Sequence, residues 1–171
     1  MKKLFFWAAA AAISVGQIVS AQAADVSLDI GQTGDSTMTY RLGTQFDFSS
    51  SWFQSGVGRL TGFWDAAYTY WEGDETSSNH SLSFTPVFVY EFAGETVRPY
   101  IEAGIGVAVF ENTDLEDNDL GSSFQFEDRL GLGLRFANQE VGVRAFHYSN
   151  AGIKQPNDGV ESYTLHYRLS F

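Results

Sequence analysis

A strict alternation of apolar and polar residues at the end of the chain constrains the fold more than any other feature. From residue 163 to residue 171 every second residue is Tyr, Leu or Phe, and the residues between them are polar or charged. A period of two is that of a β-strand with one apolar and one polar face. Residues 141–149 alternate in the same way, and residues 156–159 (Pro-Asn-Asp-Gly) supply turn chemistry between the two segments. The sequence therefore predicts a terminal β-hairpin.

The same pattern recurs along the chain and predicts eight strands. They cover residues 26–31, 38–48, 60–70, 82–92, 100–109, 124–136, 141–149 and 162–171. Their apolar faces are rich in aromatic residues, and their polar faces combine arginines and carboxylates with many glycines. These features favour an all-β fold, an eight-stranded antiparallel transmembrane β-barrel, over the alternative of a secreted β-sandwich. Because eight strands enclose a lumen that side chains can fill, we do not expect a diffusion pore.

The N-terminus has the features of a secretory signal peptide. Lys2 and Lys3 precede an apolar run over residues 4–19, and Ala21-Gln22-Ala23 has the small-x-small pattern of a cleavage site. We expect a cleaved signal peptide over residues 1–23 and a barrel over residues 24–171. No later apolar run approaches the roughly 18 residues that a spanning helix needs.

Charge and composition limit the partners and the chemistry. Without Lys2 and Lys3, eight basic residues remain against 21 acidic ones, a net charge of −13. Such an acidic chain is not expected to bind nucleic acid. The chain has no cysteine, which excludes disulfides and thiol chemistry.

Three residues with catalytic side chains share an apolar face of the terminal hairpin. Counting by twos places His147 and Ser149 on the apolar face of the first strand, and Glu161 on that of the second. A lipid-facing carboxylate and imidazole are costly unless they are paired or lie near the interface. A serine nucleophile, a histidine base and a glutamate that orients it would explain the set. An interfacial histidine, a turn-forming serine and a solvated glutamate are the alternatives that spacing leaves open.

The run from His147 to Glu161 begins with His-Tyr-Ser-Asn-Ala-Gly and continues with Lys-Gln-Pro-Asn-Asp-Gly before the glutamate. It resembles the active-site hairpin of the outer-membrane lipid A 3-O-deacylases, the PagL family. The resemblance extends over the mature chain, including residues 38–43 and 104–107. It implies a catalytic triad of His147, Ser149 and Glu161, and an oxyanion hole that involves Asn150 and Gly152. Asn150 has the wrong parity for the lipid face of a regular strand, so this role requires a bend or bulge.

The resemblance also implies a function and a location. The expected activity is hydrolysis of the ester-linked 3-hydroxyacyl chain of lipid A, in the outer leaflet of the bacterial outer membrane, with no cofactor and no metal ion. The alternative is a non-enzymatic small barrel that serves adhesion or envelope structure. A palmitoyl-transferring barrel would need a lumenal acyl pocket, which the charged polar faces disfavour. The sequence leaves open whether the protein forms a homodimer.

Other polar residues give weaker signals. His166 lies on the polar face of the last strand and is expected to form hydrogen bonds in the lumen, whereas His80 lies at a loop boundary. The acidic stretch of residues 112–121 could collect a divalent cation but lacks the spacing of an EF-hand, so a solvated loop is expected there.

Overall fold

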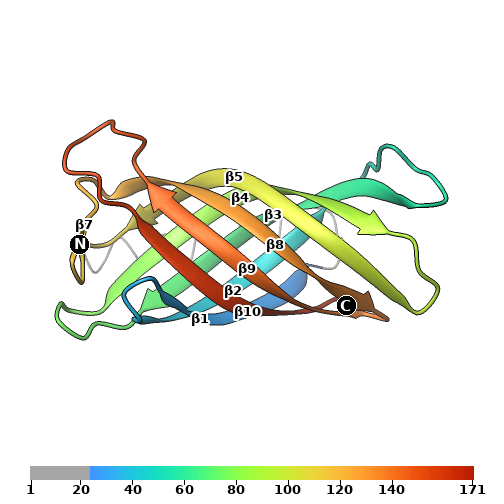
Figure 1. Cartoon of the computed structure of the whole chain (residues 1–171), viewed down its shortest axis with the longest axis horizontal. Coiled ribbons are helices and arrows are strands. Elements are labelled where there is room, and N and C mark those ends of the chain that lie inside the picture. The colour runs from blue at the N-terminus through green and yellow to red at the C-terminus, as the bar shows by residue number, and fades with distance from the viewer. Residues whose placement is uncertain (1–23) are drawn as a thin grey trace.

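The computed structural model describes residues 24–171, which form a closed antiparallel β-barrel (Figure 1). The strands follow the order β1-β10-β9-β8-β5-β4-β3-β2 around the barrel. Their bounds are β1 Asp25–Thr33, β2 Met38–Asp47, β3 Gly58–Trp71, β4 Asn79–Phe92, β5 Val97–Phe110, β8 Phe124–Phe136, β9 Gln139–Ser149 and β10 Val160–Leu169. The predicted eight-stranded antiparallel barrel is confirmed. The expected signal peptide, residues 1–23, lies outside the described residues.

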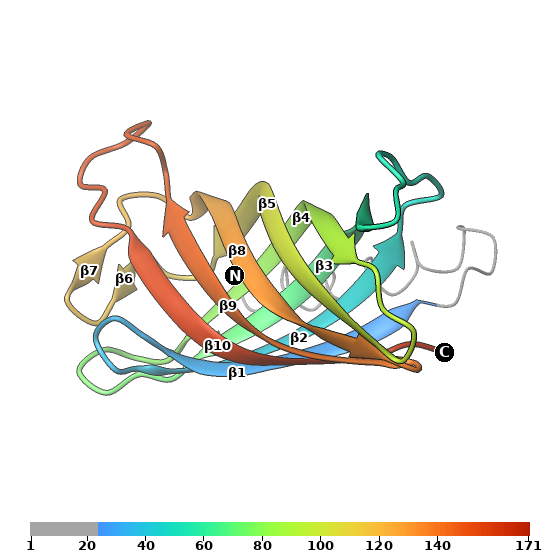
Figure 2. The same ribbon diagram turned by 45° about the vertical axis from the view of Figure 1, so that its right-hand side comes forward.

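The barrel has two ends that carry different loops (Figures 1 and 2). One end, which we call the outer end, carries residues 34–37, 72–78, 111–123 and 150–159. The other, which we call the inner end, carries residues 48–57, 93–96 and 137–138 and the C-terminus. Strands β3, β4 and β5 are 14 residues long, more than the roughly 9–11 that a tilted strand needs to cross a bilayer. Within residues 24–171 no helix is long and apolar enough to cross a membrane.

The distribution of side chains is the reverse of that in a water-soluble protein. Large apolar side chains face outward, and Leu165 and Ile105 are 70% and 69% exposed. Charged side chains face inward, and Asp29 and Asp65 are fully buried. The outward face is a broad apolar surface without protein contacts, so it is favourable only in a lipid environment.

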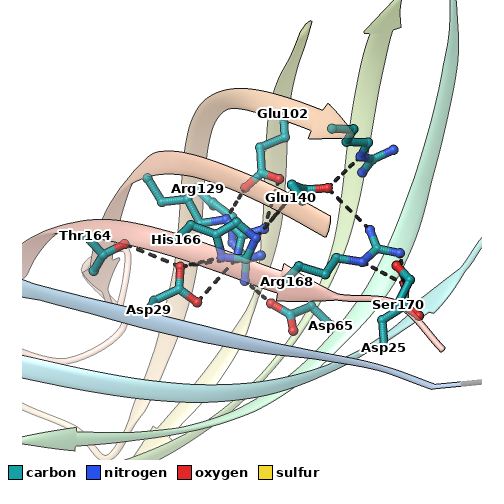
Figure 3. A network of polar contacts seen from close by, with 12 residues as sticks. Asp25, Asp29, Asp65, Glu102, Arg129, Glu140, Thr164, His166, Arg168 and Ser170 are labelled. Atoms are coloured by element: carbon teal, nitrogen blue, oxygen red, sulfur yellow. Dashed lines mark hydrogen bonds and ion pairs between the residues drawn. The ribbon is translucent and has the colours of Figure 1, made fainter. Parts of the chain in front are cut away.

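The lumen is filled by a network of ion pairs. Arg144 binds Glu102 at 2.6 Å and Asp29 at 3.2 Å, and Arg129 binds Asp65 at 2.5 Å. Figure 3 shows these carboxylates gathered around the guanidinium groups, with Glu140, His166 and Arg168 in the same network. The sharing of each charge among several partners offsets the cost of removing it from water. The expected lumenal role of His166 is confirmed, since its ring nitrogens lie 3.0 Å from Asp29 and 3.2 Å from Glu140.

The outer mouth of the lumen is closed by an apolar cluster. Trp71, Phe110 and Tyr148 pack together there with Leu115 and Leu120. The two leucines come from the acidic stretch, where the short strands β6 (Asp114–Leu115) and β7 (Asn118–Asp119) pair as a hairpin. The expectation of a solvated loop is therefore wrong for its leucines, which are buried.

Candidate active site

The terminal hairpin brings His147 and Glu161 together on the outward surface of the barrel near its outer end. Strands β9 and β10 pair antiparallel, with Glu161 directly opposite His147. The His147 Nδ1 atom lies 2.9 Å from Glu161 Oε1. Both side chains are about half exposed, at 43% and 51%. Their placement agrees with the face predicted from the alternation.

This hydrogen bond determines which nitrogen of His147 can act as a base. When Nδ1–H donates to the carboxylate of Glu161, the neutral imidazole carries its lone pair on Nε2. Ser149 lies two residues further along the same face of β9. No hydrogen bond joins the hydroxyl of Ser149 to His147 in the described part of the chain. In enzymes without bound substrate such contacts are often long and tighten only in the complex.

Gly159 lies against both His147 and Ser149. A Cβ atom at Gly159 would lie 3.3 Å from His147 Cε1, 3.8 Å from Ser149 Cβ and 3.1 Å from the carbonyl oxygen of Tyr148. Its φ of +71° is also one that residues with side chains rarely adopt. The sequence marks this glycine as a turn residue, but the close approach to the histidine depends on the register of the hairpin.

Asn150 turns away from the lipid face and is buried. Its side-chain amide donates to the carbonyl oxygens of Leu120 at 2.9 Å and Lys154 at 2.8 Å, and its backbone N–H donates to Asn157 Oδ1 at 2.8 Å. Asn150 therefore ties the loop of residues 150–159 to Leu120 in the loop of residues 111–123. In this arrangement both its amide donors are already engaged.

Gly152 lies in a turn that begins directly after Ser149. The backbone N–H of Ile153 donates to the carbonyl oxygen of Asn150 at 3.1 Å, and the two residues between them, Ala151 and Gly152, have φ of +53° and +77°. Gly152 is exposed, and no atom lies within 4 Å of the position a Cβ would take. No described hydrogen bond uses its N–H, so this donor is free to meet a ligand.

Asp128 flanks His147 on the side opposite Glu161. Strand β8 pairs with β9 so that Asp128 lies directly across from His147. Its side chain is half-buried. The sequence interpretation missed this residue, although counting by twos from Phe126 to Leu130 places Asp128 on the lipid face. The strands on both sides of His147 therefore carry an acidic residue opposite it, and Glu161 is the one whose carboxylate contacts the imidazole among the described residues.

A family model described as lipid A 3-O-deacylase (PagL) matches residues 38–170. This chain belongs to the PagL family. Lipid A deacylase PagL of Pseudomonas aeruginosa is 64% identical over 171 residues, which cover 99% of each chain. Lipid A deacylase PagL of Bordetella bronchiseptica is 38% identical over 141 residues, covering 79% of this chain and 75% of the relative.

Solved structures agree with the PagL assignment. The crystal structure of the outer membrane enzyme PagL matches with a TM-score of 0.83 and 64% identity, covering 86% of this chain and 99% of the other. A de novo designed transmembrane β-barrel matches with a TM-score of 0.52 at 16% identity, covering 87% of this chain and 95% of the other. The second likeness concerns the fold alone.

Of the two other histidines, His166 is buried with Asp29 and Glu140 in the lumen, and His80 lies on the outward surface. His80 Nδ1 lies 2.7 Å from the hydroxyl of Tyr68 on a distant part of the barrel, among outward-facing aromatic residues. Within residues 24–171 no group of three or more His, Asp or Glu side chains is placed to hold a metal ion.

Proposed function

We propose that this protein is an outer-membrane lipid A 3-O-deacylase, and that Ser149, His147 and Glu161 carry out the reaction. The observation that carries the proposal is the hydrogen-bonded pair of His147 and Glu161 on the outward surface, with Ser149 beside it. Membership of the PagL family and the 64% identity to the Pseudomonas aeruginosa deacylase support the activity and the outer-membrane location.

The proposed mechanism uses each of the three side chains once. Ser149 Oγ attacks the carbonyl carbon of the ester at the 3 position of lipid A, while His147 Nε2 takes the hydroxyl proton. Glu161 accepts the Nδ1–H bond and stabilises the imidazolium. The imidazolium then protonates the departing sugar oxygen, which leaves an acyl group on Ser149. A water molecule, deprotonated by His147, releases the 3-hydroxy fatty acid and restores the serine.

We assign the oxyanion hole to the turn that follows Ser149. The exposed N–H of Gly152 supplies a donor that faces no protein acceptor. Asn150 contributes by holding this turn through its bonds to Leu120 and Lys154. A donor aimed at the developing oxyanion contributes about 10²–10³-fold to kcat in other hydrolases.

The substrate approaches from the membrane. The lumen is occupied by ion pairs, whereas the three proposed residues lie on the lipid side. Below His147 on β9, the small side chain of Ala145 lies between Leu130 on β8 and Tyr163 on β10. This low point between larger side chains lies two residues from His147 on the same face of β9. An acyl chain of a lipid in the same leaflet can lie along it.

Mass spectrometry of lipid A tests the proposal. Expression of the intact protein should release the 3-linked hydroxyacyl chain, and Ser149→Ala should lower this activity by about 10⁴-fold or more, because triad members act as a unit. Ser50→Ala, at an exposed serine of the inner end, is the matched control and should remain active. An active Ser149→Ala barrel would exclude the serine mechanism. No deacylation by the intact protein would favour a non-enzymatic envelope barrel.

The oligomeric state is a separate question. Analytical ultracentrifugation of the refolded protein in detergent distinguishes a monomer from the homodimer that the sequence leaves open.

A further inference from the structure

Three arginines converge on one carboxylate at the inner mouth of the barrel. Arg59, Arg98 and Arg135 approach the carboxylate of Glu91 at 3.0, 3.1 and 3.1 Å. Glu91 is buried, whereas the side chains of Arg59 and Arg98 are 45% and 37% exposed. They come from β3, β5 and β8, so the barrel closure assembles this cluster from strands distant in sequence.

The acidic residues of the cluster do not balance its positive charge. Arg135 reaches a second acid, Glu140, at 2.5 Å, but Glu140 is shared with further basic side chains deeper in the lumen. Arg59 and Arg98 have no acidic partner other than Glu91 among the described residues. Asp47, whose side chain is 64% exposed, also lies at this mouth and pairs with Arg168 at 2.7 Å. Arg59, Arg98 and Arg135 therefore share Glu91, and Arg59 and Arg98 keep part of their guanidinium groups exposed.

One guanidinium donor in this cluster has no partner. Nη2 of Arg135 is buried and forms no hydrogen bond. Arg135 lines a cavity of about 130 Å³ together with Arg59, Arg98 and Arg168, and with the carboxylates of Asp47, Glu91 and Glu140. A second cavity, of about 240 Å³, shares Asp47, Arg59 and Arg135 with the first and adds the hydroxyl-bearing residues Ser49, Ser50, Ser51 and Thr61. Guanidinium atoms of Arg41 and Arg129 in the closed lumen also lack partners, but Arg135 differs from them because it borders a cavity that an acceptor from outside the protein can enter.

We propose that the inner mouth binds a small oxyanion, a phosphate or carboxylate group held by Arg59, Arg98 and Arg135. Guanidinium groups bind such groups through paired, charge-assisted hydrogen bonds. The neighbouring serine and threonine hydroxyls can donate to the remaining oxygens. This site is at the opposite end of the barrel from Ser149 and does not depend on the proposed deacylation.

The position of the cluster indicates a soluble ligand. Longer loops at the outer end and shorter turns at the inner end are the usual orientation of such barrels, which places the inner mouth in the periplasm. The three guanidinium groups point into the mouth, toward Glu91, and away from the lipid-facing surface. A free periplasmic oxyanion therefore fits better than the headgroup of a phospholipid, which offers the same phosphate chemistry.

Calorimetric titration of the refolded full barrel with pyrophosphate tests the site. We expect saturable binding in zwitterionic detergent and at least tenfold weaker binding for Arg98→Gln. Arg98 is partly exposed, so its replacement leaves Glu91 paired with two arginines; Arg59→Gln is the second variant if that barrel refolds poorly. The matched control is Lys154→Gln, which removes the same charge in an outer loop and should bind as tightly as the wild type. Lipid A deacylation should be unchanged in Arg98→Gln and Arg59→Gln, because both residues lie at the opposite end of the barrel from Ser149.

Two results would overturn the site, and a third would change its ligand. Absence of saturable binding at millimolar pyrophosphate, or equal weakening in Arg98→Gln and Lys154→Gln, would exclude a specific site. Repeating the titration in nanodiscs separates the two phosphate sources. A free oxyanion should bind equally in phosphatidylcholine and phosphatidylglycerol discs. Loss of binding only in phosphatidylglycerol would show competition by the headgroup and refute the soluble ligand.

Discussion

The lipid-facing rim and the lumen both contain charged residues, but they hold them in opposite ways. In the lumen, Arg144 and Asp29 are fully buried and each contacts several charged partners. At the rim, His147 and Glu161 are about half exposed, and one hydrogen bond joins them. A side chain with many buried partners stabilises a fold but cannot easily move a proton. The comparison teaches that the few exposed, sparsely bonded polar groups are the ones available for chemistry.

Breaking the lumenal network should have the largest effect on stability. Arg144→Ala would leave Glu102 and Asp29 without their principal partner in a region removed from water. Loss of one partner of a buried ion pair costs about 3–5 kcal/mol. Urea unfolding of the refolded barrel measures this loss, and Glu161→Gln at the rim serves as the control with a small change. An unchanged midpoint for Arg144→Ala would contradict the structural role of the network.

A smaller effect should come from the contact between the two outer loops. Gly121 has a φ of +67°, and a Cβ there would lie 1.9 Å from the carbonyl oxygen of Pro156. Gly121→Ala must displace residues 150–159, so we expect kcat to fall about tenfold, a change of about 1.4 kcal/mol in the barrier. Gly34→Ala is the matched control, because nothing lies within 4 Å of its Cβ position. Equal kcat values for both variants would show that the loop contact does not position the site.

The smallest effect concerns the pH dependence of the outer loops. Hydrogen bonds from the backbone N–H groups of Asp74 and Glu75, both 2.8 Å long, lower the pKa of Glu116 from its ordinary value of 4.5. This carboxylate therefore stabilises the loop contact above pH 4.5, and the stabilisation is lost as the pH falls through the lowered pKa. Amide exchange of Asp74 and Glu75 should accelerate in that range. The acceleration should be absent in Glu116→Gln, and its persistence there would implicate another group.

The alternation of residues predicted most of the fold because each strand contributes one face to the lipid and one to the lumen. The same parity predicted the outward placement of His147, Ser149 and Glu161. It was also sufficient to find Asp128, which was missed because the carboxylate interrupts an otherwise apolar face. These features depend on local sequence alone.

Other features depend on contacts between distant segments and could not be predicted from the sequence. The inward turn of Asn150 follows from an acceptor on Leu120, thirty residues away. The burial of Leu115 and Leu120 depends on the aromatic residues of the mouth. Strand β4 contains Pro86, which cannot donate to a strand ladder, although β4 has neighbours on both sides. Its pairing with β5 skips Pro86 and resumes in the same register.

A double-mutant comparison tests the central claim, that the three rim residues act as one unit, most directly. Lipid A deacylation rates are measured for refolded barrels carrying His147→Ala, Glu161→Gln or both. If Glu161 acts only by orienting and stabilising His147, the double variant should be little slower than His147→Ala alone. Losses that multiply would mean that Glu161 contributes without His147, and the triad would have to be abandoned.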